Sequence, residues 1–80
     1  MEYSTLNNLK NNQKAKLYRL DTCPELKKRL MDMGLVEGTD ITKLFSSADE
    51  GISAYLFRGT VVAIRREDAK KILATCEVGL

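Results

Sequence analysis

The chain has 80 residues, with 13 Lys and Arg against 11 Asp and Glu, no His and no Trp. A chain of this length forms one domain and buries only roughly 60% of the surface that its unfolded form exposes, so a deep cleft between two lobes is excluded. The formal net charge of +2 is too small to indicate a nucleic-acid partner.

The first predicted element is a loop. The tract from Asn7 to Lys14 is rich in asparagine, whose amide competes for backbone hydrogen bonds, and this favours a loop or short turn. Residues 15–20 follow, with Tyr18 between leucines three positions apart. That spacing suits a strand with a bulge, which we expect to be the first strand.

A helix is predicted over residues 23–33. Thr22 and Glu25 have the spacing of a capping box, and Pro24 falls in the first turn. Gly34 is expected to end the helix in the left-handed conformation. Apolar residues at the spacing i, i+4, i+7 predict the buried face of this helix: Leu26, Leu30 and Met33.

Three strands are predicted next, over residues 39–45, 52–58 and 60–65. Gly38 marks a tight turn before the first of them, and the polar segment 46–51 separates it from the second. Gly59 lies between the other two, where a glycine supplies the positive φ of a hairpin turn. This part of the sheet is therefore expected to be antiparallel.

The last elements are a helical turn and a closing strand. Residues 66–71 place acids before bases, as a single helical turn does to complement its dipole. Strict alternation then predicts a strand with one buried face, made by Ile72, Ala74, Cys76 and Val78. Cys76 is therefore expected to be a small core residue rather than a reactive thiol.

These elements predict a mainly β fold over a single domain, residues 1–80. The architecture is a small SH3-like barrel of about five antiparallel strands, with one α-helix between the first and second strands and a short helical turn before the last. A barrel is the usual way for such a chain to remove exposed sheet edges. An OB-fold is the rival, but it places its helix between the third and fourth strands.

Two blocks of the sequence resemble a known family. Residues 29–41, R-L-M-D-M-G-L-V-E-G-T-D-I, resemble the R-L-x-x-(M/L)-G-L-x-x-G-x-x-I signature of the ferrous iron transport protein A family, FeoA. Residues 58–69, R-G-T-V-V-A-I-R-R-E-D-A, resemble the family's R-G-x-x-I-A-L-R-x-x-(E/D)-A at the matching distance downstream. With Leu6 and Leu9, the likeness covers nearly the whole chain.

The chain departs from the family pattern at three places. Asn11 and Asn12 stand where the family often has a glycine, and residues 50–53 replace a frequent Gly-Asp-Pro. Lys43 stands where an apolar residue is common. These changes concern the shape of two loops and one position of the barrel, not the fold.

The resemblance implies a small cytoplasmic accessory of FeoB, the membrane ferrous-iron transporter that has its own GTP-binding domain. FeoA-like domains also occur fused to metal-dependent repressors, which leaves a stand-alone interaction domain of that kind as an alternative. A free-standing chain of 80 residues favours the transport role. Weak self-association stays open.

The residues themselves predict no enzyme and no cofactor. A catalytic dyad most often uses His, and the chain has none. Cys23 is the one candidate for an activated thiol, near a helix start, but a purely structural role there is favoured. With no C-x-x-C, no phosphate-binding G-x-x-x-x-G-K-[ST] and scattered acids, neither a metal site nor a nucleotide site is expected. A disulfide between Cys23 and Cys76 stays open, although the cytoplasm keeps thiols reduced.

A partner-binding surface is predicted on the helix. Met31 projects roughly 140° away from Leu26 at about 100° per residue, and so should be exposed. We expect a contact surface made by Lys27, Met31 and Leu35, because an exposed Met is an adaptable apolar contact. The alternative is a Met31 side chain that folds over Leu35.

A nucleic-acid-binding barrel is the second function class. Five basic residues could line one side of it: Arg58, Arg65, Arg66, Lys70 and Lys71. Glu67 and Asp68 interrupt that stretch, and the five aromatic residues must also supply the core. We therefore expect no nucleic-acid partner. We also expect a cytoplasmic location and no membrane insertion, because apolar runs reach only four residues and the N-terminus lacks a secretory signal.

Overall fold

The computed structural model describes residues 2–76, which form one antiparallel sheet with three helical segments. The strands are β1 (Glu2–Thr5), β2 (Lys14–Leu20), β3 (Asp40–Ser46), β4 (Ile52–Phe57), β5 (Thr60–Arg65) and β6 (Ile72–Cys76). The helical segments are the 3-10 turn η1 (Leu6–Asn8), α1 (Pro24–Asp32) and α2 (Arg66–Ala69). The strand order is β1-β6-β2-β3-β4-β5.

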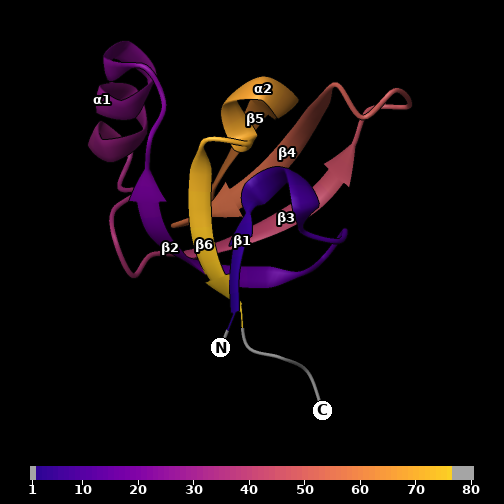
Figure 1. The fold of residues 1–80 in the computed structure, drawn as a ribbon, viewed down its shortest axis with the longest axis horizontal. Coiled ribbons are helices and arrows are strands. Elements are labelled where there is room, and N and C mark those ends of the chain that lie inside the picture. The colour runs from indigo at the N-terminus through magenta and orange to yellow at the C-terminus, as the bar shows by residue number, and fades with distance from the viewer. Residues whose placement is uncertain (1, 77–80) are drawn as a thin grey trace.

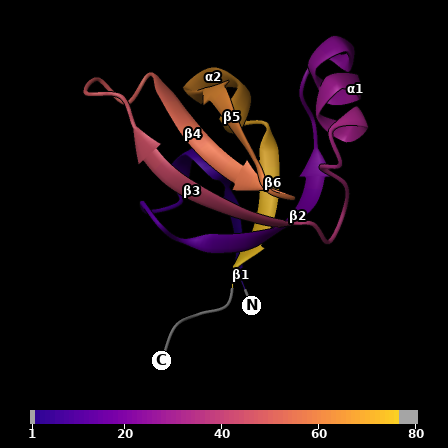
Figure 2. The ribbon, with the colours of Figure 1, turned by 180° about the vertical axis from the view of Figure 1, so that it is seen from behind.

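The sheet curls into a small SH3-like barrel, which confirms the predicted fold class. In Figures 1 and 2, α1 lies at one side of the barrel, the loop between β3 and β4 extends at the other side, and α2 lies near one end. Register shifts between Leu17 and Arg19 on β2, and between Lys43 and Phe45 on β3, mark irregular pairing that helps strongly curved strands to bend. The largest fully buried side chains fill the interior: Tyr55, Phe57, Leu6, Leu30, Leu35, Ile41 and Ile72.

The sequence prediction missed one strand. The expected first strand at residues 15–20 is β2, and the short β1 precedes it. The helix therefore lies between the second and third strands of the chain. β1 has four residues without strong alternation and pairs with β6, from Glu2 opposite Cys76 to Thr5 opposite Leu73. Its partner lies at the other end of the chain, so no local pattern indicates it.

The asparagine-rich opening tract is partly structural. Leu6 begins the turn η1 and is fully buried, and Leu9 is buried just after it. The hydroxyl of Tyr55 donates a hydrogen bond of 3.1 Å to the carbonyl oxygen of Leu6. Asn12 then takes a left-handed φ of 68°, a conformation that asparagine tolerates better than most residues, where the family often has glycine.

Helix α1 begins without the predicted capping box. Its N-cap residue is Cys23, which makes no side-chain cap hydrogen bond, and Pro24 is at the first helical position as expected. Thr22 is buried, and its Oγ1 has no hydrogen-bond partner among the described residues. The helix thus starts one residue later than the capping box requires. Glu25 still lies in the first turn, where its negative charge interacts favourably with the positive end of the helix dipole.

The end of α1 corrects one predicted core residue. Leu30 is buried and Leu26 packs partly against the core, but Met33 is exposed. The helix ends at Asp32, and Gly34 reverses the chain with a φ of 102°, as predicted. The amide of Leu35 then donates to the carbonyl oxygen of Leu30 at 2.9 Å, a helix-ending bond that turns Leu35 into the core in place of Met33.

The remaining elements match the prediction closely. The loop after α1 turns at Gly38, with a φ of 89°, and the β4–β5 hairpin turns at Arg58 and Gly59, both with positive φ. Two consecutive positive φ values are typical of the two-residue hairpin turn whose twist matches the strands. On β6 the predicted alternation is confirmed up to Cys76, which is buried, and Val78 lies outside the described residues.

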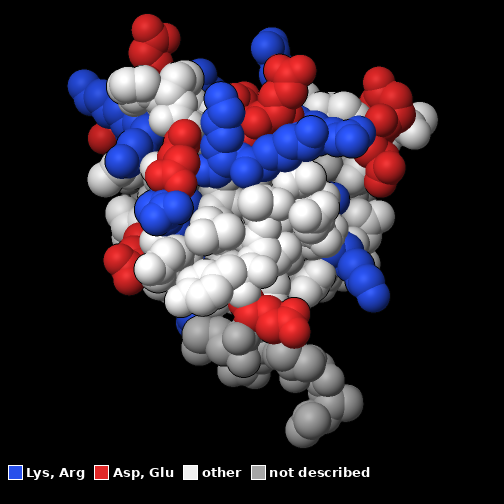
Figure 3. Space-filling view, viewed as in Figure 1, with Lys and Arg blue, Asp and Glu red and all other residues white. Residues whose placement is uncertain are grey.

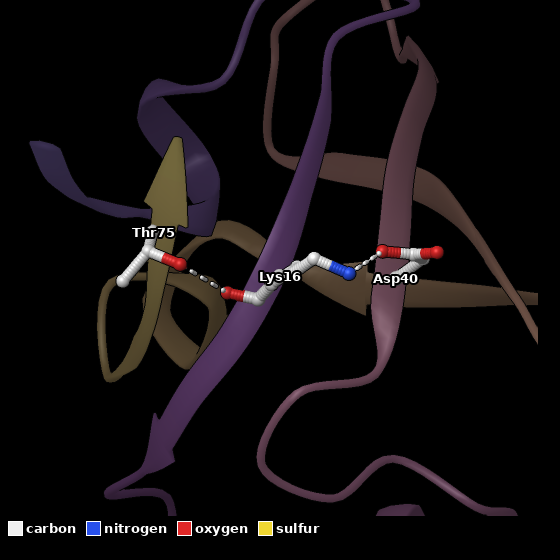
Figure 4. A network of polar contacts seen from close by, with 3 residues as sticks. All are labelled: Lys16, Asp40 and Thr75. Atoms are coloured by element: carbon white, nitrogen blue, oxygen red, sulfur yellow. Dashed lines mark hydrogen bonds and ion pairs between the residues drawn. The ribbon is translucent and has the colours of Figure 1, made fainter. Parts of the chain in front are cut away.

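One exposed polar network connects three strands (Figure 4). Lys16 Nζ on β2 lies 2.8 Å from Asp40 Oδ1 at the start of β3, and Thr75 Oγ1 on β6 lies 3.5 Å from the carbonyl oxygen of Lys16. The hydrogen bond from Lys16 holds the pKa of Asp40 below its ordinary value. Because the pair is exposed to water and salt, it contributes little to stability.

The two cysteines are free thiols in different surroundings. Cys23 is exposed at the start of α1, whereas Cys76 is buried at the end of β6. Burial raises the pKa of the Cys76 thiol, and the charge of Glu2 on the neighbouring strand raises it further. Among the helices of residues 2–76, none has the length and apolar character that a membrane span needs.

The difference between the two cysteines predicts selective alkylation. At pH 8, iodoacetamide should modify Cys23 at least about tenfold faster than Cys76, because a buried thiol with a raised pKa supplies little accessible thiolate. Mass spectrometry of quenched samples measures both rates, and Cys23→Ser should leave only the slow reaction. In urea the two rates should converge. Equal rates in the folded protein would contradict the placement of Cys76.

A second prediction concerns Gly34. A Cβ at this position would overlap Arg58 Cδ and lie 2.8 Å from Arg58 Nε, whereas a Cβ at Gly38 would meet no atom within 4 Å. Both backbones have positive φ, so Gly38→Ala should cost about 1–2 kcal/mol of unfolding free energy. Gly34→Ala should cost more in urea unfolding, and the excess should shrink when Arg58→Ala is added. An equal cost at both glycines would rule out the contact with Arg58.

Candidate partner-binding surface

The end of α1 and the loop after it carry the densest group of exposed apolar side chains in the helical part of the structure. Met31 is 46% exposed, Met33 37% and Val36 44%. The three residues fall within one six-residue segment. We call these three exposed side chains together the Met31 surface, defined by Met31, Met33 and Val36. Thioether and branched side chains that are left in water within one short segment are typical of a contact surface for another protein.

Backbone and side-chain hydrogen bonds hold this segment in place. The hydroxyl of Thr39 accepts a hydrogen bond of 3.1 Å from the amide of Val36 and donates one of 3.1 Å to the carbonyl oxygen of Gly34. The amide of Gly38 also donates to the carbonyl oxygen of Leu17 on β2, at 2.8 Å. The loop is therefore fastened to the barrel, and the Met31 surface is presented in a fixed form.

Two of the three residues predicted to bind a partner are exposed. Met31 points away from the core, as its angle from Leu26 predicts, and Lys27 is exposed on the same helix. Leu35 is fully buried in the core and cannot form part of an exposed surface. Sequence reasoning overlooked Met33 and Val36 instead, because it placed Met33 on the buried face of the helix.

Arg58 lies beside this surface rather than with the other basic residues. Its side chain packs against Gly34 just after the C-terminal end of α1, where a positive charge is favoured by the helix dipole. Arg65, Arg66 and Lys70 instead line an open hollow of about 420 Å³ together with Glu67. The basic residues that the nucleic-acid alternative places on one side of the barrel therefore lie in two separate parts of the structure.

Charge is unevenly spread over the face shown in Figure 3. Lys and Arg side chains gather over α2, with acidic side chains next to them, and a broad uncharged area lies below, over β1 and β6. Tyr3 on β1 and Tyr18 on β2 contact each other edge to face, with ring centroids 4.9 Å apart. This exposed aromatic pair could not be foreseen from sequence, because its position depends on β1.

Within the described residues, no three side chains of His, Cys, Asp or Glu come together in a way that could hold a metal ion. Asp32, Glu37 and Asp40 lie on or near the α1–β3 connection without converging. Cys23 is a free, exposed thiol at the N-cap position of α1.

Comparison with known proteins gives a consistent result. The sequence model of the FeoA domain matches residues 4–76. A Campylobacter jejuni protein named "Putative Fe(2+) transport protein A" is 34% identical over 68 residues, which cover 85% of this chain and 92% of that protein.

Solved structures agree with the sequence comparison. The FeoA protein of Chlorobium tepidum superposes with a TM-score of 0.89 at 26% identity, covering 95% of this chain and 72% of that one. A FeoA-like protein of Clostridium acetobutylicum gives 0.83 at 25% identity, covering 100% and 93%. A manganese-dependent transcriptional repressor shares the fold alone, with a TM-score of 0.81 at 13% identity over 42% of its chain. With the domain match spanning β1 to β6, the chain belongs to the FeoA domain family.

Proposed function

We propose that this protein is a small cytoplasmic accessory of ferrous iron uptake that binds the cytoplasmic part of a FeoB-type transporter. The observation that carries the proposal is the FeoA domain match over residues 4–76. The name of the Campylobacter jejuni relative refers to Fe(2+) transport as well. In this proposal iron is the cargo of the transporter, and the accessory acts by binding rather than by catalysis.

The Met31 surface is the part of the structure that best suits this role. Its apolar side chains are exposed, its loop is fastened by Thr39, and basic Lys27 and Arg58 lie near it. A partner that covers these side chains removes apolar area from water, which stabilises a complex by roughly 25 cal/mol per Å² buried before the costs of association. We therefore place the transporter contact on this surface.

The proposal predicts that Met31→Glu weakens binding to the purified cytoplasmic GTP-binding domain of the transporter. Burying a carboxylate in an apolar contact is unfavourable, so the Kd should rise by about tenfold or more. Isothermal titration measures the affinity, and an amide NMR spectrum of the variant establishes that the fold is kept. Met31 is exposed, so little change in stability is expected.

Phe45→Glu is the matched control. Phe45 is 60% exposed and lies near the end of β3, next to the β3–β4 loop, which extends at the other side of the barrel from α1 (Figure 1). Its replacement should leave the affinity within about twofold, because it introduces the same charge outside the Met31 surface. If Met31→Glu binds as tightly as the original chain, the contact is not on this surface; loss of binding in Phe45→Glu alone would place it over β3.

Nucleic-acid binding is the second candidate, favoured only by the basic side chains over α2 (Figure 3). Glu67 lines the same hollow as Arg65, Arg66 and Lys70, which weakens the attraction for phosphates. We expect no saturable binding of a DNA duplex in fluorescence anisotropy at about 150 mM salt. Tight binding at low salt that falls steeply as salt rises would favour this candidate over the accessory.

A further inference from the structure

Lys43, the residue that departs from the family pattern on β3, is buried. Its side chain lies inside the barrel wall and the residue is only 6% exposed, opposite the fully buried Tyr55 on β4. The Nζ atom donates one hydrogen bond of 3.1 Å to the carbonyl oxygen of Asn7. Among residues 2–76, no acidic side chain forms an ion pair with it. Two of its three donors are therefore available in a place where an uncompensated charge is unfavourable.

Lys43 lies in a pocket between η1, β3, β4 and the start of α2. The pocket has a volume of about 180 Å³ and six lining residues: Asn7, Asn8, Lys43, Glu50, Ser53 and Arg66. Lys43 and Ser53 are buried and form the floor, whereas Asn8, Glu50 and Arg66 are exposed and form the rim. The pocket is therefore open to a group that approaches from solvent.

The rim contributes a second cation. The backbone amide of Arg66 donates to the carbonyl oxygen of Gly51 at 3.0 Å, which fastens the start of α2 to the β3–β4 loop. The guanidinium of Arg66, however, makes no hydrogen bond or ion pair with the other described residues. Glu50 also lines the pocket and likewise forms no ion pair with either cation. The charges on the walls therefore sum to +1.

This donor set fits a single carboxylate. Lys43 and Arg66 offer charge-assisted hydrogen bonds, which a carboxylate accepts with two oxygens. A cation would be repelled by both side chains, and the carboxylate of Glu50 disfavours a second negative charge such as that of phosphate. The volume of about 180 Å³ admits a carboxylate with a short stem and excludes a nucleotide.

The pocket also offers an acceptor. Asn7 Oδ1 is buried and has no hydrogen-bond partner among the described residues. A buried acceptor without a partner is costly, and a peptide N–H is a suitable donor for it. A carboxylate that carries an amide nearby, as every Asp or Glu of a protein does, brings acceptors for Lys43 and Arg66 and a donor for Asn7.

We propose that the pocket formed by Lys43 and Arg66 binds one acidic side chain of a partner protein's peptide segment. Residues of η1 and of the β3–β4 loop line the site, and that loop extends at the opposite side of the barrel from α1 (Figure 1). It is separate from the Met31 surface and does not depend on the proposed contact with the transporter.

The test is an amide NMR titration with the blocked tripeptide acetyl-Gly-Glu-Gly-amide, compared with acetyl-Gly-Gln-Gly-amide. The Glu peptide should shift the amide signals of Ser53 and Arg66 in a saturable way, and the Gln peptide should not. Sodium acetate should bind more weakly than the Glu peptide, since it lacks an N–H for Asn7. Equal shifts with both peptides, or tighter binding of inorganic phosphate or acetate than of the Glu peptide, would overturn the proposal.

Substitutions identify which side chains donate hydrogen bonds to the bound carboxylate. Arg66→Gln should weaken binding by about fivefold or more, and Lys43→Met by about tenfold, because each removes a charge-assisted hydrogen bond. Glu50→Gln should strengthen binding by about twofold or more, since it removes repulsion. The matched control is Arg65→Gln, the same charge change one residue away and outside the pocket, with less than about a twofold effect.

Lys43→Met leaves the carbonyl of Asn7 without its donor, so that variant is interpreted only if its NMR spectrum shows the native fold. Arg66 has no side-chain hydrogen bond to lose, and Arg66→Gln therefore decides the matter on its own. Equal effects of Arg66→Gln and Arg65→Gln, or unchanged binding in Glu50→Gln, would show that only general surface charge attracts the peptide, and the pocket would be rejected as its site.

Discussion

The structure depends on the hydrogen bonds that the backbone carbonyl groups of one turn, η1, accept. η1 places Leu6 in the core, and a buried carbonyl that lacks a donor is strongly unfavourable. The carbonyl oxygen of Leu6 accepts from the amide of Leu9 within the turn and from the hydroxyl of Tyr55 on β4. The carbonyl oxygen of Asn7 accepts from the ammonium of Lys43 on β3. Both side-chain donors come from the middle of the sheet. The turn therefore connects the N-terminal segment to β3 and β4, which are not its neighbours in the strand order.

This constraint explains why a lysine can occupy a wall position of the barrel. An apolar residue at position 43 would fill the same space, but it would leave the carbonyl of Asn7 to another donor. The ammonium makes that bond and keeps further hydrogen-bonding capacity directed toward a polar pocket. A replacement that looks unfavourable from sequence thus has a structural role, and that role also creates a binding opportunity that the apolar residue would not offer.

The sequence predicted what is encoded locally. Pro24, Gly34 and Gly59 mark the start of α1, its end and the β4–β5 hairpin, and each acts through its own backbone geometry. It did not predict β1 or the buried role of η1, because both depend on partners far along the chain, β6 and Tyr55. The exposure of Met31 followed from helical periodicity. The burial of Leu35 did not, because it is set by the bond between its amide and Leu30 after the helix has ended.

The two candidate surfaces differ in the physics of recognition. The Met31 surface offers adaptable apolar side chains, which give affinity with little demand on the exact shape of the partner. The pocket of Lys43 and Arg66 offers directed donors in a confined space, which discriminate between a carboxylate and its amide while adding modest affinity. The surfaces share no residue, and α1 and the β3–β4 loop, which carry parts of them, lie at opposite sides of the barrel (Figure 1), so their contributions should add. A partner that spans both would gain specificity from the pocket and affinity from the Met31 surface.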